Sequence, residues 1–125
     1  MKKQNVLLAL FSLIVSLFII SCTISGMTTT SNQYDNFAKC LTDKGVKMYG
    51  AYWCSHCNNE KALFGESFQY VDYTECSLPD NSGQTQVCLN ANIDSYPTWE
   101  FKDGSRIKGE MTFLQLSQKS GCSLS

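Results

Sequence analysis

The chain has 125 residues, of which 17% are charged and 43% are apolar, so it can build one modest hydrophobic core but not two. The chain has ten Lys and Arg residues and eleven Asp and Glu residues, so its positive and negative charges nearly balance. No basic cluster occurs beyond Lys2-Lys3, so the sequence lacks the positive surface that nucleic-acid binding requires, and we expect no nucleic-acid partner. Seven cysteines in so short a chain indicate either disulfides formed in an oxidising compartment or a metal site.

The N-terminal residues have the layout of an export signal. Residues 6–20 are apolar except for two serines, and they follow Lys2-Lys3 directly, as in a signal peptide. The run is shorter than the roughly 20 residues that span a bilayer, although an uncleaved signal anchor stays an alternative. The segment Ile19-Ile20-Ser21-Cys22 resembles the lipobox of bacterial lipoproteins, which predicts lipidation of Cys22.

These signals divide the chain into three parts. We predict a signal peptide of the lipoprotein type over residues 1–21, a flexible Ser/Thr-rich tether over 22–32, and a folded domain over 33–125. The domain is expected outside the cytoplasm of a bacterial cell, in the periplasm or on the outer surface. A lipid or a signal anchor would tie it to the membrane.

The folded part alternates helical and strand patterns. Helices are predicted where apolar residues recur every three or four positions, and strands where short runs are rich in β-branched and aromatic residues. In chain order these are a helix over 34–41, a strand over 46–52, a helix over 54–64, a strand over 70–75, a helix over 85–91, a hairpin of strands over 98–101 and 106–108, and a helix over 112–121. This order indicates an α/β fold.

The motif with the clearest chemistry is Trp53-Cys54-Ser55-His56-Cys57, between a predicted strand and a predicted helix. Two cysteines one helical turn apart can close a disulfide, and a helix N-terminus favours a thiolate on the first of them. Cys54 is therefore the predicted nucleophile, and Cys57 is predicted to resolve the mixed disulfide formed with a partner. His56 can stabilise the Cys54 thiolate and so make the disulfide a stronger oxidant. An ordinary surface role is the alternative for His56.

Two metal-based interpretations compete with the redox motif. A zinc site needs a second pair of ligands, but Cys76 and Cys88 are not spaced as such a pair. Covalent haem attachment needs a His directly after the second Cys, and Asn58 stands there. We therefore predict no metal and no other cofactor.

A resemblance to the thioredoxin superfamily covers about residues 33–122. It is carried by Ala51-Tyr52-Trp53-Cys54, His56-Cys57, Tyr96-Pro97-Thr98 and Phe101-Lys102-Asp103-Gly104. The wider pattern is similar to the thioredoxin-like domain fused to bacterial homologues of vitamin K epoxide reductase. That pattern adds Lys61, Phe64-Gly65, Cys76, Cys88, Trp99 and Ser120-Gly121-Cys122.

The resemblance implies a central mixed sheet flanked by helices and a cis Tyr96-Pro97 bond that faces the active disulfide. It also implies that Trp53, Tyr96 and Pro97 bind substrate. In the fused proteins this domain oxidises exported protein thiols and passes the electrons to a membrane-embedded, quinone-linked part. Because the sequence has one hydrophobic segment, we expect that part to be a separate protein, with a vitamin K epoxide reductase homologue as the candidate.

Two positions depart from the family pattern. Ser55 stands where the family commonly has Pro, so the redox potential cannot be carried over. Met48 stands where thioredoxin has the buried carboxylate that accepts the proton of the second cysteine. Glu60 or water is a candidate substitute for that carboxylate.

The four remaining cysteines, Cys40, Cys76, Cys88 and Cys122, allow three pairings. We favour Cys76 with Cys88 and Cys40 with Cys122, which in the loop-entropy model contribute about 3 and about 4.5 kcal/mol. A structural role is the default expectation. A second redox relay at Cys76/Cys88 and free thiols at Cys40 and Cys122 are the alternatives.

Three functions follow as hypotheses. The first is a dithiol oxidase that forms disulfides in exported proteins, with a reduction potential above about −200 mV. The second is a disulfide reductase or isomerase in the same compartment. The third is a Cys-rich zinc-binding lipoprotein.

Overall fold

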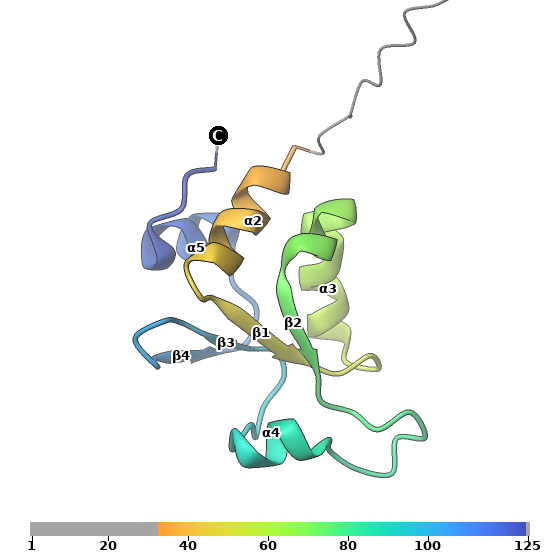
Figure 1. The fold of residues 1–125 in the computed structure, drawn as a ribbon. Helices are drawn as coiled ribbons and strands as arrows, with labels where there is room; N and C mark the ends of the chain where they lie inside the picture. The colour runs from red at the N-terminus through yellow and green to blue at the C-terminus, as the bar shows by residue number, and fades with distance from the viewer. Residues whose placement is uncertain (1–32, 125) are drawn as a thin grey trace, which may run out of the picture. The chain divides into compact units, whose positions relative to one another are not determined.

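The computed structural model describes residues 33–124, so the predicted signal segment, tether and lipidation at Cys22 lie outside the described residues. Helices and strands are labelled as in Figure 1. They are α2 (Asp35–Asp43), β1 (Lys47–Gly50), α3 (Ser55–Phe64), the 3-10 helix η1 (Gly65–Tyr70), β2 (Asp72–Glu75), α4 (Gln86–Asn90), β3 (Thr98–Glu100), β4 (Arg106–Lys108) and α5 (Phe113–Ser120). Among these described elements, none is a helix of the length and apolarity needed to cross a membrane.

The strands form one mixed sheet in the order β2-β1-β3-β4. β1 and β2 are parallel, whereas β3 is antiparallel to both β1 and β4. Parallel neighbours need a crossover, and α3 with η1 supplies it between β1 and β2. The predicted α/β class with a mixed sheet flanked by helices is confirmed.

Helices cover both faces of the sheet, with α2, α3 and α5 on one side and α4 on the other (Figure 1). Successive residues of a strand point to opposite faces, and β1 shows this directly. Met48 is buried in the larger core, with residues of α2, α3 and α5. Tyr49 packs in a second, smaller core with Cys76, Cys88 and Ile93.

The start of the strand predicted after α3 was wrong. The predicted strand over 70–75 begins only at Asp72, because residues 65–70 form η1. Gly65 ends α3 with φ +56°, a left-handed value that a residue without Cβ adopts at little cost. The buried Ser67 hydroxyl then donates to the Asp35 carboxylate at 2.7 Å, which ties η1 to α2. That tertiary contact has no counterpart in local periodicity.

Two disulfides join elements that are distant in sequence. Cys40 of α2 bonds Cys122 beyond α5, and Cys76 after β2 bonds Cys88 in α4. These are the pairings that the sequence analysis favours. Because all four of these sulfurs are in disulfides, they are not available as zinc thiolates.

Candidate active site

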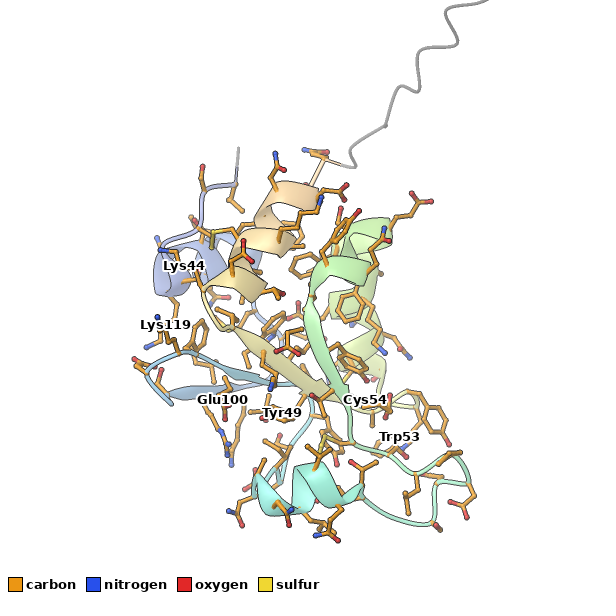
Figure 2. The ribbon with its side chains drawn as sticks, viewed as in Figure 1. Lys44, Tyr49, Trp53, Cys54, Glu100 and Lys119 are labelled. Atoms are coloured by element: carbon orange, nitrogen blue, oxygen red, sulfur yellow. A yellow bond between two sulfur atoms is a disulfide. The ribbon has the colours of Figure 1, made fainter. Side chains whose placement is uncertain are left out.

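Cys54 occupies the position just before α3, at the carboxyl end of β1 (Figure 2). It is the N-cap residue of the helix, with an extended backbone, and its sulfur accepts a hydrogen bond from the Cys57 N–H at 3.4 Å. An N-cap acceptor satisfies one of the free N–H groups of the first turn. The same N–H groups and the helix dipole favour negative charge on this sulfur. Cys54 is 7% exposed, so it is buried except for a small exposed area.

Cys57 lies one turn further into α3 and is fully buried. Both Cys54 and Cys57 are free thiols in the structure. Burial raises the pKa of Cys57 to about 12, and the neighbouring Cys54 adds to the rise. The two thiols therefore differ in their surroundings: Cys54 caps the helix and retains a small exposed area, whereas Cys57 is fully buried and its burial favours the protonated thiol.

Aromatic side chains surround the Cys54 thiol. Trp53 is 52% exposed, and its ring meets the Tyr96 ring edge-on, with centroids 5.9 Å apart. The Tyr96-Pro97 peptide bond is cis, and the Cys54 thiol donates to the Tyr96 carbonyl at 3.7 Å. The structure thus brings the predicted substrate-binding residues Trp53, Tyr96 and Pro97 to the predicted nucleophile.

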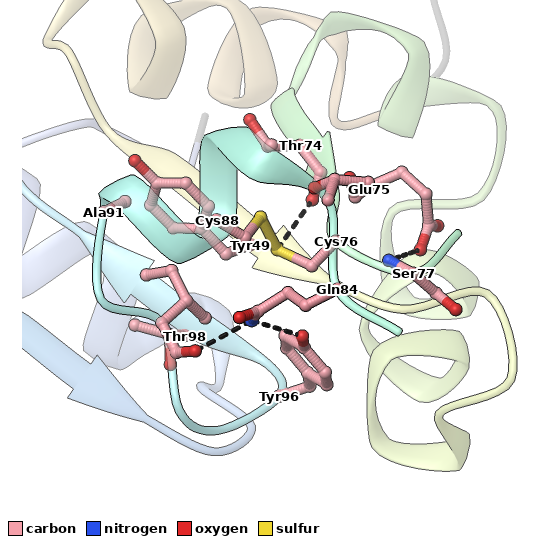
Figure 3. The surroundings of a disulfide bond; sticks show 12 residues. Tyr49, Thr74, Glu75, Cys76, Ser77, Gln84, Cys88, Ala91, Tyr96 and Thr98 are labelled. Carbon is pink, nitrogen blue, oxygen red and sulfur yellow. Dashed lines mark hydrogen bonds between the residues drawn. A yellow bond between two sulfur atoms is a disulfide. The ribbon is translucent and has the colours of Figure 1, made fainter. Parts of the chain in front are cut away.

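The segment closed by the Cys76–Cys88 disulfide contacts both aromatic residues, Trp53 and Tyr96. Figure 3 shows the disulfide and the contact between Gln84 and Tyr96. Ser77 Oγ accepts from the Trp53 indole N–H at 2.9 Å. Gln84 Nε2 lies 2.6 Å from the Tyr96 hydroxyl. Both cysteines of the bridge are fully buried, which fits a structural role and gives an external thiol no path to the sulfurs.

His56 does not hydrogen-bond to Cys54 in the structure. Its ring is exposed, and Nδ1 lies 2.6 Å from Glu110 Oε1. Hydrogen bonds from His56 and Asn59 lower the pKa of Glu110. Glu110 was not predicted from the sequence, because 54 residues separate it from His56 and no local pattern links them.

Glu60 is the buried carboxylate that the sequence analysis named as a substitute proton acceptor. It is fully buried, and one of its oxygens accepts the Met111 N–H. Burial raises the pKa of Glu60, while Met111 N–H and the Trp99 indole partly offset the rise. Within residues 33–124, Glu60 Oε2 and Trp99 Nε1 are buried without a hydrogen bond of normal geometry. Glu60 therefore holds the loop before α5 through Met111.

Two further residues near the thiols were missed. Tyr73 and Glu75 lie on β2, and the Tyr73 hydroxyl donates to Glu75 Oε2 at 2.7 Å. The other Glu75 oxygen accepts the Tyr52 N–H at 3.1 Å, just before the redox motif. The sequence does contain a feature from which the position of Glu75 could have been predicted. The carboxyl ends of parallel strands share one sheet edge, and Glu75 ends its strand as Gly50 ends the strand before Cys54.

A search of the described residues finds no group of three or more His, Cys, Asp or Glu side chains that could hold a metal ion. The chemistry of the site is that of its two free thiols. An external thiolate or disulfide can exchange with Cys54, and Cys57 can then attack Cys54 to release the partner.

A mixed sheet that presents two free thiols at a helix N-terminus, beside a cis-proline, forms a site at which thiol-disulfide exchange can take place. The chain is similar to the thiol-disulfide oxidoreductase LTO1 of Arabidopsis thaliana, with 39% identity over 92 residues. This match covers 70% of the chain but 24% of the length of that protein. Among solved structures, oxidised thioredoxin O2 from Arabidopsis thaliana aligns with a TM-score of 0.38 and 15% identity, over 72% of this chain and 87% of its own. No family model matches the sequence.

Proposed function

We propose that this protein is a dithiol oxidase that introduces disulfides into exported proteins. The observation that carries the proposal is the pairing of a free thiol that caps a helix N-terminus, Cys54, with a fully buried free thiol one turn further on, Cys57. A substrate thiolate attacks Cys54 of the closed pair, and Cys57 leaves as a thiolate and takes up a proton. A second substrate thiolate then attacks the mixed disulfide, which forms the substrate disulfide and frees Cys54.

The oxidising direction depends on how well the reduced pair is stabilised. The α3 N-terminus stabilises a Cys54 thiolate, and His56 adds to this stabilisation if its ring turns toward the sulfur. The Glu110 carboxylate, 2.6 Å from His56, offsets the charge of a protonated ring. This ion pair is the specific observation that favours the second candidate function, a reductase or isomerase.

Redox titration of residues 33–125 against glutathione separates the two functions. We expect a potential above about −200 mV for the oxidase, compared with about −270 mV for thioredoxin. His56→Gln should lower the potential, and the matched variant Glu110→Gln should raise it by freeing the imidazole. A wild-type value near that of thioredoxin would replace the oxidase with the reductase.

Trapping experiments test the roles of the two thiols. Cys57→Ala should accumulate mixed disulfides with exported proteins, because the resolving thiol is gone. Cys54→Ala is the matched control and should trap none, because the remaining Cys57 is fully buried. Equal trapping by Cys54→Ala would reverse the assignment.

We further propose that the domain works outside the cytoplasm, tethered through lipid on Cys22, and that a membrane-embedded partner re-oxidises it. The support is the apolar run over residues 6–20 and the sequence Ile19-Ile20-Ser21-Cys22. Cys22→Ser should abolish lipid labelling in a bacterial host. An unmodified Cys22 in the membrane fraction, detected by mass spectrometry, would instead favour a signal anchor.

A further inference from the structure

Thiol-disulfide exchange requires the buried Cys57 to exchange its proton with another group. Cys57 must lose its proton when it attacks a mixed disulfide and regain it when it leaves. It is fully buried, and burial raises its pKa. The β1 residue at the position of the thioredoxin carboxylate is Met48, which is also fully buried and cannot accept a proton.

Two side chains of β2 lie on the same sheet face as Cys57. Tyr73 is opposite Met48 and Glu75 is opposite Gly50 in the parallel β1/β2 pair. Residues two apart on a strand point to the same face, and Met48 belongs to the core that contains Cys57. Tyr73 packs against this core as well.

The Tyr73 phenol and the Cys57 thiol both approach the backbone of Gly50. A Cβ built on Gly50 would lie 3.0 Å from Cys57 Sγ, 2.9 Å from Tyr73 Cε2 and 3.1 Å from the Tyr73 hydroxyl oxygen. The thiol and the phenol therefore converge on one small volume that the missing side chain leaves open. Any residue larger than Gly at position 50 would fill that volume.

From this volume, hydrogen bonds lead to a carboxylate at the sheet edge. The Tyr73 hydroxyl donates to Glu75 Oε2 at 2.7 Å. Glu75 Oε1 accepts the N–H groups of Tyr52 at 3.1 Å and Ser77 at 2.9 Å, which fixes the orientation of the carboxylate. Glu75 is half-buried, so it can exchange protons with solvent.

The other charged or titratable groups around Cys57 come from α3 and its N-cap. Cys54 is the N-cap itself, and the Lys61 ammonium lies 4.0 Å from the centre of the Tyr73 ring. Glu60 is on the same helix and its Oε2 has no hydrogen-bond partner among the described residues, but the side chain is fully buried and has no contact with solvent. The β2 pair is therefore the better placed acceptor.

We propose that Tyr73 and Glu75 relay the proton of Cys57 to and from solvent. The proposal rests on the proposed thiol-disulfide exchange. When Cys57 resolves a mixed disulfide, its sulfur forms a bond to Cys54 Sγ, and the bond between Cys54 and the substrate sulfur breaks, releasing a substrate thiolate. The Cys57 proton moves to the Tyr73 oxygen while the Tyr73 proton moves to Glu75 Oε2. In substrate oxidation the bonds and protons move in reverse.

The test separates the two thiol steps in one stopped-flow trace. Reduced protein is mixed with 5,5′-dithiobis(2-nitrobenzoate), which releases one coloured thiolate when Cys54 attacks and a second when Cys57 resolves the mixed disulfide. Tyr73→Phe and Glu75→Gln are the relay variants. Glu75→Gln keeps an oxygen for the Tyr52 and Ser77 N–H groups but removes the proton acceptor. Tyr70→Phe, which removes a phenol hydroxyl elsewhere, is the matched control.

We expect the first phase to be unchanged in every variant and the second phase to slow by about 100-fold near neutral pH in both relay variants, the lower end of general-base effects. Their deficit should shrink as the pH rises, because hydroxide then removes the proton directly. Tyr70→Phe should follow the wild type in both phases.

Three results would overturn the relay. The first is a second phase of wild-type rate in Tyr73→Phe. The second is a second phase slowed by the same factor at every pH in the relay variants, which indicates a structural role. The third is a pH-dependent slowing of the second phase in Glu60→Gln that the relay variants do not show. A wild-type protein that shows no second phase would instead refute the proposed function.

Discussion

Substituting Gly50 with Ala places a methyl group at the most crowded point of the redox site. The new Cβ would stand 2.9 to 3.1 Å from atoms of Tyr73 and Cys57, closer than the roughly 3.5–4.0 Å of a good carbon contact. Overpacking of this kind costs about 1–3 kcal/mol. Ala also lowers the conformational entropy of the unfolded chain, which stabilises the folded state by about 0.4–1 kcal/mol. We therefore expect Gly50→Ala to lower the free energy of unfolding by about 0–2.6 kcal/mol, with a central value of about 1.3 kcal/mol.

Urea denaturation with the structural disulfides intact measures this loss, read from the midpoint at an unchanged m value. Gly83→Ala is the matched control, because the nearest atom to its Cβ is Leu78 Cδ1 at an ordinary 3.9 Å. Without a clash, only the entropy term remains, so Gly83→Ala should raise the free energy of unfolding by about 0.4–1 kcal/mol. If Gly50→Ala is as stable as Gly83→Ala, the close approach of β1, Tyr73 and Cys57 is wrong, and with it the geometry of the proton relay.

Replacing both cysteines of a bridge with Ala should cost about 4.5 kcal/mol for Cys40–Cys122, which closes 82 residues, and about 3 kcal/mol for Cys76–Cys88, which closes 12. Urea denaturation that gives the reverse order would contradict the loop-entropy account. Glu60→Gln should stabilise the protein at neutral pH, because burial raises the pKa of Glu60 in the folded state. The folded state then binds the proton more tightly, so wild-type stability falls as pH rises above the unfolded pKa of about 4.3. The gain should vanish below that pH, and a gain independent of pH would point to packing instead.

The sequence by itself was sufficient to single out the two thiols that the structure leaves free and the elements that carry them. Cys54 and Cys57 are one helical turn apart after a short apolar strand, and both features are local, so periodicity and spacing are sufficient to locate them. The α/β order follows from the same local patterns. The pairing of the other cysteines was open among three choices, and one was favoured because it would tie the turn after the second strand to the next helix and the first helix to the end of the chain.

Tertiary structure decided which side chains surround those thiols. His56 Nδ1 lies 2.6 Å from Glu110 Oε1 across 54 residues of sequence, so the imidazole that was expected beside Cys54 is directed to a carboxylate instead. Tyr73 comes to Cys57 because β2 pairs in parallel with β1 in a register that sets Tyr73 opposite Met48. A shift of one residue would turn Tyr73 to the other face of the sheet. Strand register depends on the packing of the whole core rather than on the residues of one strand, so the surroundings of Cys57 could not be predicted from its neighbours in sequence.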